Sequence, residues 1–509
     1  MAFRRFFLFS VGILFLLVAL AVALGPWYTS QIADHALKSA IQEINRHGTF
    51  DARYQRIAYG WFGQEGRLIL VPTAPKARQT LQKTNGSDEL VLRLQIAYGP
   101  LPFASWGRDG VSLMPVGAII DARLPGLEKS LHKAGSAYRL RDVVGLSGNS
   151  QFLANLQPGK LTTPDGAHMQ WGKVRLEIDQ NGGRINGQGH FGAFSLNATN
   201  GYLRLQPASL RIGNLQVKDG LSAGRIQLDW QGMSFNVPDK QQPHRRIAGF
   251  LKSFTLLSDT HFGEGVTYGR ATLGIKAMEI RQPANAPKAT FSMRDIRLQA
   301  SSTPPRGAFM DSTLDWQAMR MEISGQQYAP VQLVITLDHQ YVPALKEMMQ
   351  GFRKLQAQAR ENAYSQVPTR LFYQRAIGLL MPSVQQFIAH YPVLRLKKLN
   401  IGTPEGSLQA EGEARLTPAG GGSPSLLTLP QDLVADLSLE VPPAIARHLL
   451  SAALERRGVP SDQLTKVTTM QLQQMQSAGW IKLEKGIYKT RIDYSRGAMD
   501  IYGHPVPLG

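Results

Sequence analysis

The chain has 509 residues, of which 43% are hydrophobic and 18% are charged, a composition typical of folded domains. It contains no cysteine, which excludes disulfides, thiolate nucleophiles and cysteine-based zinc or iron–sulfur sites. A net charge of +19 predicts a generally basic exposed surface, with contact to an anionic membrane surface as the alternative. The basic residues are dispersed and no nucleic-acid-binding motif accompanies them.

The N-terminal segment predicts a membrane anchor. Arg4 and Arg5 precede nineteen uncharged, largely apolar residues, 6–24, which as a helix would span about 28 Å. Positive charge before this segment and none directly after it predict a cytoplasmic N-terminus, with the bulk of the chain on the other side of the membrane. A cleaved signal peptide is the alternative, since "AVA" at 21–23 has small residues in suitable places. We expect residues 1–27 to form a cytoplasmic stub and a single-pass anchor, and we expect no nucleic-acid partner.

A juxtamembrane amphipathic helix is expected over 28–50, with Gly48 as its C-terminal stop. Residues 51–340 then show short runs of period two, cut by Gly, Asn, Asp and Pro, which predict an extended antiparallel β region. Regular crossover helices are missing from the pattern, although the stretch 123–145 leaves a helix open. The apolar stripe of the juxtamembrane helix consists of Ile32, Ala36, Leu37, Ala40, Ile41 and Ile44.

Helical periodicity returns over 341–391, with Pro368 as a break and Pro382 as a kink. Strands are predicted over 392–440, a helical pair over 441–479 and a terminal β hairpin over 480–509. The expected fold class is mainly β with α segments (α+β). After the transmembrane helix we expect an elongated, bulged antiparallel sheet, a groove or half-barrel, flanked by helices.

One short sequence occurs twice, as "LDWQGM" at 228–233 and "LDWQAM" at 314–319, with "MQWGKV" at 169–174 as a looser copy. In all three, apolar residues lie two before the Trp and three, five and seven after it, so the apolar positions change parity within the strand. A strand keeps such residues on one face only if a residue is inserted, which predicts a β-bulge at the two residues after the Trp. Asp229 and Asp315 then face away from the apolar side, so the repeat indicates architecture and not catalysis.

The residues around these tryptophans are candidates for lining an apolar groove, and filling an ordinary core is the alternative for each of them. The candidate groove-lining residues are Trp171, Trp230, Phe235, Trp316, Met319 and Met321.

No pattern of residues predicts catalysis. The eleven histidines never show metal-ligand spacing, and "GLSGNS" at 145–150 is not a nucleophile elbow. "GQGHFG" at 187–192 matches a dinucleotide-binding pattern literally, but strand-like residues follow it, so we interpret it as a hairpin turn. We predict no catalytic residue, metal, cofactor or enzymatic activity. Distant carboxylates that converge as in glycosidases stay an open alternative.

Three segments carry a resemblance to a known family: "YQRIAYGWFGQEGRLIL" (54–70), "NIGTPEGSLQAEGEARL" (400–416) and the closing "GWIKLEKGIYKTRIDYSRGAMDIYGHPVPLG" (479–509). They resemble the YdgA-like family, inner-membrane-anchored envelope proteins of bacteria without an assigned function. The order of anchor, helix, long β region, helices and terminal hairpin is similar over nearly the whole chain. The resemblance implies an inner-membrane anchor with a periplasmic bulk. It also implies a looser similarity to AsmA-like envelope proteins, whose curved sheets accommodate lipid.

These observations predict a non-enzymatic, membrane-anchored periplasmic protein that binds or passes lipids or other hydrophobic ligands along a curved sheet. Its expected partners are the inner membrane, lipids and other envelope proteins. A protein-interaction scaffold or assembly factor is the main alternative. A hydrolase that acts on envelope polymer is a more distant one.

Overall fold

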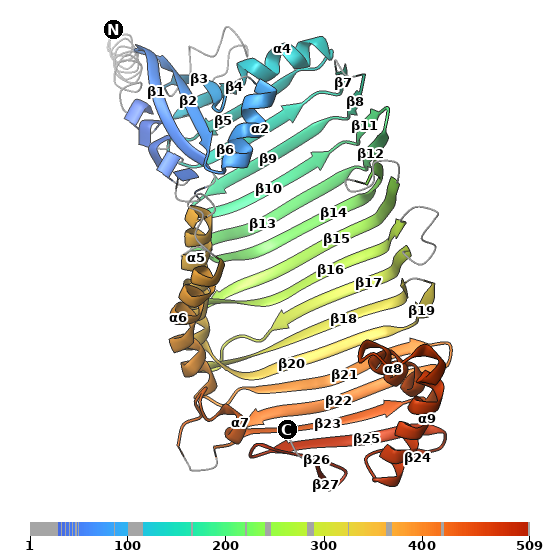
Figure 1. Cartoon of the computed structure of the whole chain (residues 1–509). Coiled ribbons are helices and arrows are strands. Elements are labelled where there is room, and N and C mark those ends of the chain that lie inside the picture. Colours follow the sequence, from blue (N-terminus) through green and yellow to red (C-terminus); the bar gives the residue numbers. More distant parts are fainter. Residues whose placement is uncertain are drawn as a thin grey trace, which may run out of the picture. The chain divides into compact units, whose positions relative to one another are not determined.

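The computed structural model describes residues 29–506 except 32, 36, 40, 43, 46–47, 49, 86, 100–115, 164–165, 219–220, 240–245, 282–289, 324, 363–368 and 419–421. The chain is mainly β, as Figure 1 shows in colours that follow the sequence. It divides into two compact units. Unit 1 contains residues 1–199, 204–218 and 356–368. Unit 2 contains residues 200–203, 219–355 and 369–509. The predicted stub and anchor, residues 1–27, lie outside the described residues.

The strands of unit 1 pair antiparallel with their neighbours. The main series has the order β1–β2–β3–β4–β5–β6–β9–β10–β13, and a shorter series has the order β7–β8–β11. The strands are β1 Phe50–Gly60, β2 Gly63–Pro72, β3 Leu90–Tyr98, β4 Ala118–Arg123, β5 Tyr138–Val144, β6 Ser150–Leu156, β7 Gly159–Thr162, β8 His168–Trp171, β9 Val174–Asn181, β10 Arg184–Phe191, β11 Phe194–Ala198 and β13 Ala208–Lys218. β12 (Gly201–Leu205) contains residues of both units.

A helix covers one face of the first strands of unit 1. The helical residues within 29–45 place Ala33 and Leu37, both buried, against Leu94, Ile96 and Tyr98 of β3. Leu37 belongs to the predicted apolar stripe, whereas Ile32, Ala36 and Ala40 lie outside the described residues. Burial of these apolar side chains on the sheet stabilises both elements.

Two further helices connect strands of unit 1, α2 (Pro75–Asn85) and α4 (Pro125–Lys133). Both begin with proline, which suits the first helical turn. α4 lies within the stretch where the sequence left a helix open. α2 was not expected, because its sequence, PKARQTLQKTN, is almost entirely polar and carries no apolar stripe of helical period.

The strands of unit 2 also pair antiparallel, in the order β14–β15–β16–β17–β18–β20–β21–β22–β23–β25–β26–β27, with β19 against the end of β18 and β24 against β25. The strands are β14 Leu221–Pro238, β15 Arg246–Gly263, β16 Val266–Arg281, β17 Thr290–Ser302, β18 Phe309–Ile323, β19 Gln326–Tyr328, β20 Val331–Tyr341, β21 Val393–Thr403, β22 Gly406–Leu416, β23 Leu433–Val441, β24 Lys482–Glu484, β25 Ile487–Ser495, β26 Ala498–Ile501 and β27 His504–Val506.

The helices of unit 2 lie at the ends of these strands in Figure 1. Val342 of α5 packs with Val266 and Met310, near the turn between β15 and β16, and Gly351 of α5 lies against Leu380 of α6. At the opposite end of the strands, the His448 ring of α8 is 3.4 Å from the Gln326 side chain of β19. The helices are α5 Val342–Asn362, which extends into the residues of unit 1, α6 Thr369–Ile388, α7 Leu429–Asp432, α8 Pro443–Arg456 and α9 Ser461–Ser477.

The secondary structure changes close to the expected positions. Helix begins at Val342, strand resumes at Val393, helix returns at Pro443, and the last strands start at Lys482. Pro382 lies inside α6, while Pro368 is outside the described residues. The closing segment holds four short strands where one hairpin was predicted. The boundary between the compact units falls inside the expected β region 51–340, so the units do not follow the predicted segments.

The predicted parity change exists, but in β14–β18 a one-sided bulge does not produce it, whereas in β21 Lys397 is skipped with no counterpart in β20, as a bulge requires. In each strand from β14 to β18, one residue is skipped by the ladder, and the skipped residues lie opposite one another without a shift of register. Ser253 and Asp295 are left-handed there, with φ of 54° and 50°. Because every strand changes face at the same level, no strand gains a residue over its neighbour. We call this row the seam; it consists of Gln231, Ser253, Lys276, Asp295 and Met319.

The repeat and the seam are not in the same register. In β14 the skipped residue directly follows Trp230, as predicted, but in β18 it lies three residues after Trp316. The third copy differs again. Gly172 and Lys173 separate β8 from β9 directly opposite Gly192 and Ala193, which separate β10 from β11, so both sides bend with equal numbers of residues.

The sequence GQGHFG does not form a hairpin turn. Gly187 and Gly189 lie in the middle and last part of strand β10, paired with Ile178 and Leu176 of β9. The turn between the two strands is made instead by Gly182 and Gly183, both with positive φ. Strand β11, and not a helix, follows the motif, so the helix N-terminus that a pyrophosphate site requires is missing there.

Candidate functional site

An apolar surface in unit 2 is built from cross-strand rows of β14–β18 and β20. We call it the apolar face. Two rows lie on each side of the seam, and each row joins side chains that point to the same side of the sheet. The rows are Leu228–Leu256–Leu273–Leu298–Trp316–Leu333, Trp230–Phe254–Ile275–Ile296–Ala318–Val331, Met233–Leu251–Met278–Met293–Met321 and Phe235–Gly249–Ile280–Phe291–Ile323.

The two sides of the seam share one packed cluster. Met293 on one side of the seam and Ile296 and Ala318 on the other are buried together, at 8%, 7% and 1% exposed. The side chains of Trp316 and Met321 pack against this cluster from β18. The change of parity at the seam therefore keeps the apolar side chains of both halves on one face, which is the physical use of the irregularity.

The apolar face stays half-exposed. Val237, Ile280, Leu314 and Ile323 are 38–42% exposed, and the tryptophans and leucines of the inner rows are only partly buried. In unit 1 the first helix covers the corresponding apolar side chains. Across the described part of unit 2, the helices pack at the ends of the strands. In the middle of the face the tryptophans and leucines stay partly exposed, while Met293, Ile296 and Ala318 are buried.

A hollow of about 370 Å³ lies at one end of the apolar face. Small residues of the adjacent strands, Gly269, Ala271 and Ala300, leave the space, and Leu314 and Ile335 line it. Ala271, Ala300, Leu314 and Ile335 pair in register across β16, β17, β18 and β20. The short alanine side chains therefore lie beside longer ones, which leaves the hollow.

The predicted groove-lining residues separate into three groups. Trp230, Phe235, Trp316 and Met321 lie on the apolar face, and the Trp230 ring meets Phe254 edge to face with centroids 6.3 Å apart. Met319 is the seam residue of β18 and is 63% exposed, so it does not belong to the rows. The sequence placed it inward because its position after the Trp matches that of Met233.

Trp171 lies in unit 1 and not with the other tryptophans. Its indole N–H donates to the Gln157 carbonyl at 3.0 Å, and its ring lies over Gly159, where a Cβ would come within 2.5 Å of it. The glycine thus makes room for the indole. Trp171 therefore fills a local packing site between β7 and β8.

The opposite face of the same strands carries the two repeat aspartates. Gln227 donates to Asp229 at 2.8 Å, and one Asp315 oxygen is buried without a hydrogen-bond partner among the described residues. Asp229 and Asp315 occupy different cross-strand rows on strands that are separated by β15, β16 and β17. They do not meet. Within the described residues, no group of three His, Asp or Glu side chains could hold a metal ion.

The missed residues of the apolar face are those on β15, β16 and β17, above all Phe254, Met278 and Met293. Their strands carry no copy of Leu-Asp-Trp-Gln, so the repeat gave no signal for them. The looser sequences LGIKAMEI and FSMRDIRL share the parity change and mark the same seam.

Fold and face together define a mainly β protein whose antiparallel strands present a large, half-exposed apolar surface. The chain belongs to a family described as bacterial protein of unknown function (DUF945), whose model matches residues 8–509. No curated protein and no solved structure matches it. No helix among the described residues is long and apolar enough to cross a membrane, and the predicted anchor at 6–24 lies outside them.

Proposed function

We propose that this protein is a non-enzymatic, membrane-anchored protein of the bacterial envelope that binds or passes acyl chains along the apolar face. The observation that carries the proposal is the partial exposure of the apolar face in unit 2, where Ile280 and Ile323 are 38% and 42% exposed and the tryptophans and leucines of the rows are only partly buried. Contiguous apolar surface of this kind is rare on soluble monomers and marks a binding surface for a hydrophobic partner. The proposal includes the single-pass inner-membrane anchor, the periplasmic bulk and the YdgA-like and AsmA-like similarity.

The chemistry of the face suits flexible hydrocarbon. Methionine forms nearly the whole row that begins at Met233, and its unbranched side chain adapts to ligands of varied shape. The tryptophans and leucines of the two rows that begin at Leu228 and Trp230 supply broad apolar contact. The net charge of +19 favours ligands with anionic headgroups, such as phospholipids.

Photo-crosslinking tests this function in cells. A photoreactive amino acid at Leu314 reports on the apolar face, because Leu314 lies two residues before Trp316 on the same side of β18 and is 39% exposed. The same amino acid at Gln317, three residues later on β18 and in the row of Arg297 and Gln332 on the opposite face, is the matched control. We expect lipid adducts in the full chain at position 314 and not at position 317, identified by mass spectrometry.

The alternative outcomes are distinct. Discrete protein adducts at position 314, without lipid, would favour the scaffold or assembly factor. Equal lipid labelling at positions 314 and 317 would show only proximity to the bilayer and would contradict a binding face.

A further inference from the structure

The hairpin between β1 and β2 ends in an exposed aromatic tip, which we define as residues 57–63. Its sequence, IAYGWFG, contains no charged residue. Ile57, Tyr59 and Trp61 are 49%, 61% and 60% exposed. Ile57 is exposed because the ladder shifts between Arg56 and Ala58, which makes it the extra residue of a bulge.

The tip lies at the start of the first helix. Near the helix end, the Asn45 side chain bonds both backbone groups of Ala52, at 2.6 and 3.1 Å. Farther back, the Arg56 guanidinium meets the Asp34 carboxylate at 2.9 Å. The helix and β1 therefore run antiparallel. Toward the chain start, the helix continues about 7.5 Å past Asp34, and β1 continues about 13 Å past Arg56, so the tip projects beyond residue 29.

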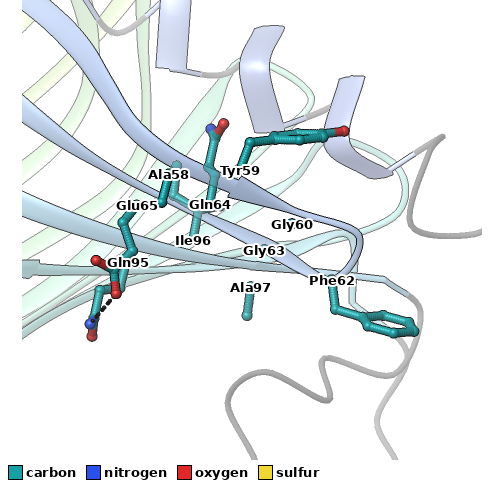
Figure 2. Close-up of a pocket in the computed structure, with 10 residues that line it drawn as sticks. All are labelled: Ala58, Tyr59, Gly60, Phe62, Gly63, Gln64, Glu65, Gln95, Ile96 and Ala97. Carbon is teal, nitrogen blue, oxygen red and sulfur yellow. Dashed lines mark hydrogen bonds between the residues drawn. The ribbon is translucent and has the colours of Figure 1, made fainter.

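One aromatic side chain of the tip, Tyr59, has defined neighbours. The Arg56 guanidinium lies 5.3 Å from the centre of the Tyr59 ring, and the Tyr59 and Tyr98 rings are 6.5 Å apart. Figure 2 shows Tyr59 and Gln64 on one side of the hairpin and Phe62 projecting from its turn, around a hollow of about 590 Å³. The contact of the Arg56 guanidinium with the ring favours this orientation of Tyr59 beside the hollow.

We propose that this tip inserts into the interfacial layer of a phospholipid bilayer and forms a second membrane contact. The inference rests on the proposed anchor. Residue 24 ends the apolar segment, and five residue steps of at most about 3.6 Å hold residue 29 within about 18 Å of it. The tip extends past residue 29 in the direction that leads from Asp34 to residue 29. An anchor that ends at residue 24 therefore keeps the tip near the bilayer surface.

The composition of the tip favours lipid over a protein partner. Tryptophan and tyrosine are the residues that prefer the membrane–water interface, where the ring is apolar and its N–H or O–H stays hydrated. The charge of Arg56 beside the tip is balanced by Asp34, and residues 57–63 carry no charge that would oppose insertion. Such a contact would fix the orientation of unit 1 on the membrane, because two points of attachment restrict rotation more than one does.

A fluorescence experiment on the full chain tests the tip, and the absence of native cysteine makes single labels unique. Trp61→Cys carries an environment-sensitive fluorophore, with the protein in vesicles of phosphatidylethanolamine and phosphatidylglycerol. Lys133→Cys, exposed at the end of α4, is the control, because β4 runs away from the tip before α4 begins. Trp27→Cys reports on the anchor.

We expect a blue shift of the label at position 61, with quenching by brominated acyl chains, and neither change at position 133. If position 61 behaves like position 133 while position 27 is quenched, the tip proposal is wrong and the anchor stands. If neither 27 nor 61 is quenched, both fail. Quenching at 61 without quenching at 27 would support the tip and remove the anchor. Shielding of position 61 from aqueous iodide without lipid quenching would indicate a protein contact and overturn the proposal.

Discussion

Asp142 is a carboxyl placed among apolar side chains. It lies in register between Ile120 of β4 and Phe152 of β6, and one of its oxygens is buried without a hydrogen-bond partner among the described residues. Burial raises the pKa of Asp142 above its usual value. In the neighbouring cross-strand pair, the carboxylate of Asp121 has hydrogen-bond partners, because the Arg141 guanidinium donates to both of its oxygens at 2.8 Å.

Asp142→Asn should flatten the dependence of stability on pH. Between the unfolded pKa of about 3.9 and the raised folded pKa, the native state binds the proton that the unfolded state has released. Stability therefore falls as pH rises through this window. Denaturant titrations from pH 4 to 8 should show the variant more stable than the wild type at pH 7 and equal to it near pH 4.

The control for this experiment is Asp121→Asn, which should lower stability by about 3 kcal/mol because it leaves Arg141 without its countercharge in a nearly buried place. An Asp142→Asn variant that is less stable at every pH would contradict the account of Asp142.

At the scale of the element, the seam explains the single mismatch in the repeat. Gly232 has a φ of 126°, and a Cβ there would lie 2.0 Å from the Leu251 carbonyl oxygen. Ala318 occupies the corresponding place in the second copy, but the seam passes after it, so it lies in a regular ladder and is buried against Met293 and Ile296. Glycine at 232 is required by the backbone conformation, whereas alanine at 318 fills a place in the buried cluster.

Gly232→Ala should therefore cost about 3 kcal/mol or more in the free energy of unfolding, since it combines a strained φ with a backbone clash. Ala318→Gly, the reciprocal change, should cost only about 1 kcal/mol. Urea denaturation of both variants measures the difference. Equal losses in the two variants would show that the two copies are structurally equivalent, against the register seen here.

The periodicity of the sequence was enough to predict these elements, because alternation and turn residues are local properties. It predicted the strands of 51–340, the helices from Val342 and Pro443, and the change of parity near Trp230. It could not predict that the irregular residues of β14–β18 align, because Ser253, Lys276 and Asp295 acquire their role only from the residues opposite them. It also missed α2, whose polar sequence has no apolar stripe.

At the scale of the whole molecule, the uncovered apolar face predicts stabilisation by ligand. A ligand that binds only the folded state at about 100 times its dissociation constant adds about 2.7 kcal/mol of apparent stability. Titrating phosphatidylglycerol into the full chain in a non-ionic detergent should raise its melting temperature. Leu314→Glu should abolish most of the rise by placing a charge on the face, whereas Gln317→Glu should retain it. Equal stabilisation of both variants would contradict binding at this face.

The sequence by itself determined the elements of this protein: its strands and helices, the apolar segment at its start, and the recurrence of Leu-Asp-Trp-Gln as architecture. These follow from local periodicity and composition. Only the tertiary structure decided which side chains share a surface. It separated Trp171 from Trp230 and Trp316, removed Met319 from the apolar face, and added Phe254, Met278 and Met293 to it. The physical reason is that a face of a sheet is made by pairing across strands, and one skipped residue per strand reverses every side chain beyond it.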